Sequence, residues 1–115
     1  MAIPKPHADI TEAMQPIVLT DVPMKERILR FREPLMLQPV IENGWFVTRY
    51  PALDIVAGGS TRDELLQDLS DEICIAWELF ADVDDERLTP QAQTLKQTLR
   101  SLLQEVEYAT TQTEG

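Results

Sequence analysis

The sequence is poor in the residues that build most catalytic and metal sites. Its 115 residues include one cysteine, Cys74, and one histidine, His7. A single cysteine excludes an intramolecular disulfide framework and a cysteine-rich zinc site. His7 lies in a proline-rich N-terminal stretch, so no Ser-His or Cys-His pair with a fixed geometry can be assembled around it. We therefore expect no catalytic, cofactor-binding or metal-binding residues, and no enzymatic activity.

Long apolar runs are also missing. No run approaches the ~20 residues that a transmembrane helix needs, and the N-terminus lacks the apolar stretch of a signal peptide. We expect a cytoplasmic protein with no membrane partner. The hydrophobic fraction of 43% and the charged fraction of 26% are ordinary for a globular protein, and the length suits one domain with one core.

Positive charge is scarce in the second half of the chain. The formal net charge is −10, and residues 1–50 hold six acids and six bases, whereas residues 51–115 hold fourteen acids and four bases. Most of the excess lies between Asp63 and Glu86. A surface of this sign repels phosphate, so a nucleic-acid partner is not expected. It could attract a basic protein partner, or it could merely keep the protein soluble.

The chain divides into three parts by composition. Residues 1–24 contain four prolines and show no sustained hydrophobic period, which predicts a flexible, proline-rich arm. A single domain is expected over residues 25–108, followed by a frayed tail at 109–115. Met24 stands just before the first patterned segment, and translation could begin there.

Several strands are expected in the first half of the domain. KERILRFRE alternates apolar with charged residues, which is typical of a half-buried strand, and Pro34 indicates an edge or separate strand. The runs LMLQPVIE and WFVTRY are joined by Asn43-Gly44. This pair is the strongest short hairpin signal, because a type I′ turn needs positive φ at both central residues. LDIVA adds another strand at about residues 53–57.

The stretch GGSTRDELL, residues 58–66, lies where the pattern changes from strand to helix. A helix N-terminus after glycines can attract anions, but the lysine of a Walker loop and the three spaced glycines of a dinucleotide turn are missing. We interpret the stretch as a structural corner, because Thr61 is a good N-cap and Glu64 completes a capping box. The helix then runs from Arg62 to about Ala81. Its apolar stripe consists of Leu66, Leu69, Ile73, Trp77 and Phe80.

Thr89-Pro90 begins a second helix as N-cap and first helical residue, with an apolar stripe that continues to Val106. Strands that precede helices indicate the α+β class. We expect a small antiparallel sheet of three or more strands packed against one main helix, plus a C-terminal amphipathic helix. Ile75 and Leu79 lie off the main stripe and could contact either the second helix or a second subunit. We expect a homo-oligomer, with these two residues as its candidate interface.

The acidic link DVDDE, residues 82–86, separates the two helices. A calcium loop needs glycine at its sixth position and glutamate at its twelfth, but the chain has Arg87 and Gln93 there, so a solvated link is expected. Trp45 and Tyr50 lie on the hairpin and could stay outside the core, although a second core layer under the N-terminal segment would also explain them. The candidate partner-binding residues are Trp45, Tyr50, Asp82, Asp84 and Asp85.

The run PVIENGWFVTRYPALDIVAGGSTRDELLQDLSDEI resembles the partial RNase H-like domain of HicB-type antitoxins. That family shows an extended strand, a glycine turn, an aromatic strand ending in Pro-x-Leu, a third strand ending near glycine and a Thr-capped acidic helix. The resemblance covers about residues 37–80. The family usually carries Pro-Gly-Cys or similar after the leucine, where this chain has Asp54-Ile55-Val56. The matching positions are Gly44, Trp45, Tyr50, Pro51, Leu53, Gly59, Thr61, Glu64 and Leu65.

The resemblance implies the fold, homo-oligomerisation and capture of a small basic toxin-like protein, with no catalytic residues. Antitoxins of the family commonly carry a C-terminal DNA-binding segment. LTPQAQTLKQTLRSLLQEV is expected to form one amphipathic helix with little positive charge, so DNA binding is not carried over. A structural or regulatory homo-oligomer without a toxin partner is the alternative. A hydrolase with carboxylate–metal chemistry is the third and weakest hypothesis.

Overall fold

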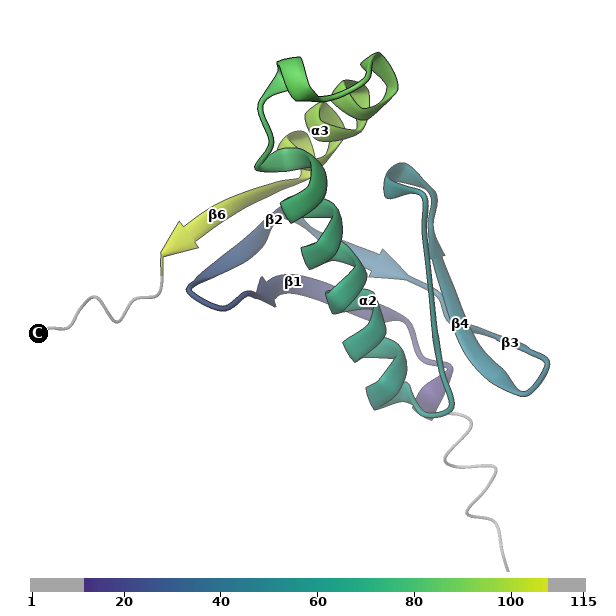
Figure 1. Cartoon of the computed structure of the whole chain (residues 1–115). Coiled ribbons are helices and arrows are strands. Elements are labelled where there is room, and N and C mark those ends of the chain that lie inside the picture. Colours follow the sequence, from purple (N-terminus) through teal and green to yellow (C-terminus); the bar gives the residue numbers. More distant parts are fainter. Residues whose placement is uncertain (1–11, 108–115) are drawn as a thin grey trace, which may run out of the picture.

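The computed structural model describes residues 12–107, so His7, the first eleven residues of the predicted arm and the predicted frayed tail lie outside the described part. The fold is α+β, as the order of strands and helices predicted (Figure 1). Its strands are β1 (Ile17–Pro23), β2 (Arg27–Leu37), β3 (Val40–Glu42), β4 (Trp45–Tyr50), β5 (Ile55–Gly59) and β6 (Leu103–Glu107). Its helices are α2 (Arg62–Ala76), which continues as a π-helical segment (Trp77–Ala81), and α3 (Pro90–Leu102).

The strands form two antiparallel three-stranded sheets instead of one. Their orders are β1-β2-β6 and β3-β4-β5, and α2 crosses in front of the first sheet while it also packs against β5 (Figure 1). Because β2 is the central strand of the first sheet, the prediction of an edge or separate strand was wrong. Pro34 is tolerated because residues 31–34 of β2 have no register partner in β1, so its missing N–H interrupts no ladder bond with that strand.

Strand β1 contradicts the prediction of a flexible arm through residue 24. Ile17 and Val22 are 1% and 0% exposed, and both belong to the core. A strict period of two would place residues five positions apart on opposite faces. The register shift between Leu19 and Asp21 changes which face of the sheet successive side chains point to, so Ile17 and Val22 both point inward. For this reason the sequence of the strand shows no simple alternation of apolar and polar residues.

Arg62 anchors the residues that precede β1. Its guanidinium donates hydrogen bonds to the backbone carbonyls of Gln15 at 2.7 Å and Pro16 at 3.1 Å. Further bonds reach the carbonyls of Glu12 and Ala13. The first turn of α2 therefore holds residues 12–16 in place, and the only basic group of GGSTRDELL is occupied by the chain's own backbone.

The hairpin and the corner follow local sequence signals. Asn43 and Gly44 have φ of 52° and 82°, which confirms the predicted turn. The Thr61 hydroxyl accepts a hydrogen bond from the Glu64 amide at 3.1 Å, as an N-cap should. In a capping box the glutamate side chain accepts a hydrogen bond from the N-cap amide. Here the Glu64 carboxylate accepts hydrogen bonds from Ser60 instead, from its amide at 2.9 Å and from its hydroxyl at 2.7 Å. The corner is structural, as predicted.

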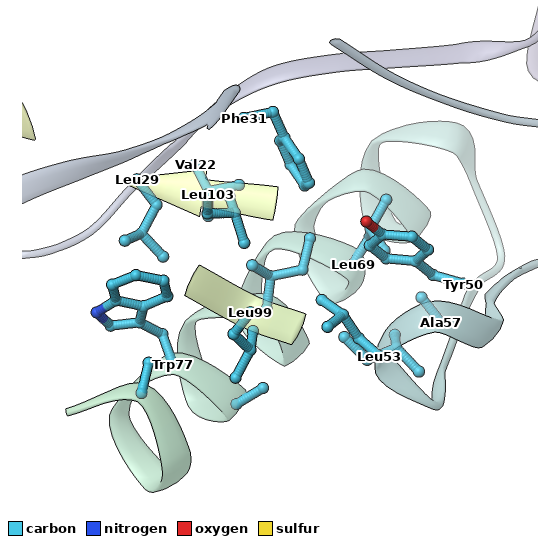
Figure 2. Packing of buried hydrophobic residues seen from close by; sticks show 14 of the residues in the cluster. Val22, Leu29, Phe31, Tyr50, Leu53, Ala57, Leu69, Trp77, Leu99 and Leu103 are labelled. Atoms are coloured by element: carbon cyan, nitrogen blue, oxygen red, sulfur yellow. The ribbon is translucent and has the colours of Figure 1, made fainter. Parts of the chain in front are cut away.

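The core joins both sheets to both helices. Figure 2 shows side chains from β2, β4, α2, α3 and β6 converging on one cluster. Trp77, predicted on the inner stripe, is 1% exposed. The predicted continuation of the second helix to Val106 was wrong, because α3 ends at Leu102 and Leu103 begins β6 directly. Residues 103–107 form their backbone hydrogen bonds with residues 27–31 of β2 instead of within a helix. Helical periodicity is a local pattern, so it could not predict this pairing.

Candidate interaction surfaces

The predicted partner-binding residues do not form one site. Trp45 lies at the end of β4 next to the corner, because its neighbour Phe46 pairs with Gly59. Asp82 follows the far end of the helical run over residues 62–81, a run of about 30 Å at 1.5 Å per residue. Trp45 and the acidic link therefore lie near opposite ends of α2 and its continuation (Figure 1).

Tyr50 belongs to the core, so its assignment to a partner surface was wrong. It is 6% exposed, and its ring centroid lies 6.4 Å from that of Phe31. Burial raises the pKa of the Tyr50 hydroxyl. Trp45, by contrast, is 53% exposed. The two aromatic residues occupy opposite faces of β4, because five positions separate them along an extended strand.

The acidic link is partly neutralised by bases from other elements. Asp82 pairs with Arg27 at 2.6 Å, and Asp85 pairs with Lys96 at 2.9 Å. Burial is the largest single influence and lowers the pKa of the Arg27 guanidinium, but its hydrogen bond to Asp82 and the charges of Asp82, Glu105 and Glu78 together raise the pKa. Asp84 is exposed and makes no ion pair within residues 12–107. The link therefore carries less free charge than its composition indicated.

Helix α2 and its continuation carry the larger unneutralised charge. Within the described residues none of their acids makes an ion pair. Two of these acids serve the fold, since Glu64 caps the corner and Asp68 accepts from the Gly58 amide at 3.0 Å. Asp71 accepts a hydrogen bond from Gln67 at 2.9 Å, which leaves its charge in place. The acids are Asp63, Glu64, Asp68, Asp71, Glu72 and Glu78.

Ile75 and Leu79 form an exposed ridge beside these acids. They are 49% and 57% exposed, so the alternative of a core contact with the second helix was wrong. Helix α3 packs against the π-helical segment, but this packing leaves both side chains about half exposed. We call Ile75 and Leu79 the α2 ridge. Asp71, Glu72 and Glu78 lie three or four positions from Ile75, which makes them its neighbours on the helix surface.

A charged junction around Trp77, which the sequence did not predict, joins the end of α2 to β2 and β6. The indole N–H donates to the Glu105 carboxylate at 2.9 Å, and Glu105 also pairs with Arg27 at 2.7 Å. The Arg100 guanidinium lies 5.1 Å from the centre of the Trp77 ring and donates to the Ala81 carbonyl. The junction satisfies a buried indole and holds β6 in place, which is a structural role.

Other titratable groups offer no catalytic arrangement that we can identify in the described part of the chain. No group of three or more His, Cys, Asp or Glu residues there could hold a metal ion. Burial raises the pKa of the Cys74 thiol, and the nearby Glu78 and Asp71 raise it further, so this thiol is a poor nucleophile. Two basic residues of β2 also interact within the chain, since Arg30 pairs with Asp21 at 2.9 Å and Arg32 donates a hydrogen bond to the Arg100 carbonyl at 3.2 Å.

Comparisons with known proteins add no relative. None of the protein-family models, curated proteins and solved structures compared with the chain matches it. The resemblance to HicB-type antitoxins therefore stays a prediction from the motif residues. Among residues 12–107, no helix is both long and apolar enough to cross a membrane.

Proposed function

We propose that the chain is a non-enzymatic interaction module that captures a basic partner protein on the exposed acidic face of α2. The observation that carries this proposal is the set of α2 carboxylates without ion pairs beside the exposed α2 ridge. Opposite charges steer a partner to this face, while apolar side chains supply affinity that exposed ion pairs alone do not.

The resemblance to HicB-type antitoxins supports a small toxin-like protein as the partner. We propose the cytoplasm as the place of action on the separate ground that the N-terminal sequence does not resemble a signal peptide. The structure changes which residues we assign to the contact. Tyr50 is excluded by burial, and Trp45 lies near the opposite end of α2 from the acidic link. We propose that Asp71 and Asp84 contribute charge without a basic neighbour in an ion pair, and that Glu78 contributes charge although it interacts with Arg27 at longer range. Asp82 and Asp85 contribute less because Arg27 and Lys96 neutralise them.

Capture can be tested with matched variants as bait in a pull-down from the native cell. Asp71→Asn/Glu78→Gln removes two acids from the α2 face, and Glu33→Gln/Asp54→Asn removes two exposed acids elsewhere. We expect a basic protein to be retained by the wild type and the control, lost by the α2 variant, and released by salt. Equal retention by both variants, or duplex DNA bound as strongly as any protein, would contradict the proposal.

A structural or regulatory homo-oligomer without a basic partner is the second candidate. The exposed apolar residues favour it, because they offer a second copy of the chain surface to bury. A pull-down that returns only the bait chain, from cells in which the untagged protein is also made, would support this alternative over capture.

A further inference from the structure

The sheet β3-β4-β5 has one open face. Its inner face carries Tyr50 and Ala57, which lie in the core next to α2. Side chains alternate along a strand and register partners share a face, so the opposite face can be assigned from the pairing. It carries Val40 and Glu42 of β3, Trp45, Val47 and Arg49 of β4, and Val56 and Gly58 of β5. We call this set of residues the outer sheet face.

Apolar side chains dominate the outer sheet face. Trp45 and Val56 are 53% and 56% exposed, and Val40 is 39% exposed. Gly58 places no side chain beside Val47, and an added Cβ would lie 3.4 Å from the Phe46 carbonyl oxygen and 3.8 Å from the Val47 methyl. An exposed tryptophan beside exposed valines on an open sheet face offers a large apolar area to bury against another sheet face.

The charges on the outer sheet face neutralise each other. Arg49 makes two hydrogen bonds to the Glu42 carboxylate, at 2.6 and 2.9 Å. The two residues lie on either side of the Val40–Val47 row in the register, so their joined side chains extend across that row. This explains why Val47 is only 9% exposed on an open face. The pair leaves the face with no net charge.

Charge indicates which partner fits this face. A second copy of the chain carries the same net charge of −10, so contact through the α2 ridge would bring Asp71, Glu72 and Glu78 of two copies together. Like charges in contact cost free energy. The outer sheet face imposes no such repulsion, and it also offers no excess of acids to attract a basic protein.

We propose that two copies of this chain associate through their outer sheet faces, with Trp45 and Val56 as the main contacts. Two sheets can pack face to face at about 10 Å. The Glu42–Arg49 pair of each copy then lies within the contact, where each residue can pair inside its own chain or with the opposite charge of the other copy. This inference does not depend on capture of a basic partner, because it uses a different surface.

Sedimentation velocity over a range of protein concentrations tests the proposal. Trp45→Thr/Val56→Thr removes the apolar contacts with a residue that favours strands, and Ile75→Gln/Leu79→Gln makes the matched change on the α2 ridge. We expect the wild type to dimerise and the sheet variant to dissociate at least about tenfold more readily, a change of about 1.4 kcal/mol. The ridge variant should dimerise like the wild type.

Thermal unfolding by circular dichroism serves as the control for folding. Both substituted residues of the sheet variant are exposed, so its midpoint should match that of the wild type once the contribution of dimerisation at the protein concentration used is allowed for. A wild type that stays monomeric at hundreds of micromolar would overturn the proposal. So would a dimer that the sheet variant retains, or one that the ridge variant weakens as much as the sheet variant does.

Discussion

The two neighbouring glycines at the end of β5, Gly58 and Gly59, lack a side chain for different physical reasons. A Cβ on Gly59 would lie 2.6 Å from the Glu64 Cβ and 2.6 Å from the Leu65 amide nitrogen, within the first turn of α2. A Cβ on Gly58 would meet nothing closer than the Phe46 carbonyl oxygen at 3.4 Å. Gly59 therefore permits close contact between the strand and the helix, while Gly58 shapes the outer sheet face.

We predict that Gly59→Ala destabilises the protein by about 1–3 kcal/mol, because the backbone of α2 must shift to admit the methyl group. The measurement is urea-induced unfolding, followed by circular dichroism. Gly58→Ala is the matched control and should unfold at nearly the urea concentration of the wild type. Equal loss in both variants would show that strand flexibility, and not the contact with α2, explains the effect.

Glu64 should make stability depend on acid pH. The hydrogen bonds from the Ser60 hydroxyl and amide lower the pKa of this carboxyl below its ordinary value of 4.5. A lowered folded-state pKa stabilises the fold above the unfolded-state pKa, and this stabilisation is lost as the pH falls through the folded-state pKa. We predict that Glu64→Gln melts below the wild type at pH 7, and that the difference disappears in acid.

The control for this pH series is Glu33→Gln, an exposed acid on β2 with no hydrogen bond of this kind among the described contacts. Its melting temperature should follow that of the wild type more closely at every pH. A difference between Glu64→Gln and the wild type that persisted or grew in acid would show that the side chain acts through packing instead of charge.

At the scale of elements, β1 is the strand whose contribution most needs a test. Val22 is 0% exposed and Val18 is 56% exposed on the same strand. We predict that Val22→Ala lowers the free energy of unfolding by about 1.5–3 kcal/mol, because two buried methyl groups worth about 0.8 kcal/mol each are lost and a cavity remains, and that Val18→Ala changes it little. Chemical unfolding of both variants is the measurement. An unaffected Val22→Ala would show that β1 is not part of the cooperative core.

The elements that the sequence predicted are those with local signals. Asn43-Gly44 requires positive φ, and Thr61 and Thr89 cap helices through amides three residues later, so each signal lies within a few residues of its effect. Strands β1 and β6 exist because both pair with β2. The partner of β6 is remote in the chain, since Leu103 pairs with Phe31. Strand β1 pairs with the next strand along the chain, but the turn at residues 24–26 lacks a short hairpin signal such as Asn-Gly. Neither strand has a clear period of two, so composition suggested an arm and a longer helix.

The same difference between local signals and long-range contacts explains which candidate surface residues the sequence predicted correctly. Helical periodicity placed Ile75 and Leu79 off the main stripe, but it could not tell whether the second helix would cover them, and the structure leaves both exposed. Arg27 neutralises Asp82 from 55 positions away, and no local pattern could reveal that pair. The burial of Tyr50 and the exposure of Trp45 depend on which face of β4 turns towards α2, which only the assembled fold decides.

At the scale of the whole molecule, the chain has two exposed surfaces with different electrostatic character. The α2 side carries acids without ion pairs, whereas the outer sheet face contains one internal ion pair and no net charge. These surfaces lie on opposite sides of the second sheet, because the inner face of that sheet packs towards α2. A dimer formed through the sheets would therefore leave both α2 faces free, and one assembly could serve both proposed interactions.

Salt should act on these two interactions in opposite directions. Two copies with a net charge of −10 repel each other at any approach, and the range of that repulsion falls from about 10 Å at 0.1 M salt to about 3 Å at 1 M. Since the outer sheet face has no net charge to attract its counterpart, screening should strengthen self-association. Capture of a basic protein by the α2 face should weaken over the same range, mainly through slower association. Sedimentation velocity of the chain alone and binding kinetics with the captured partner measure the two effects. Self-association that weakened with salt would mean that ion pairs hold the copies together, as contact between the α2 acids and arginines of a second copy would require.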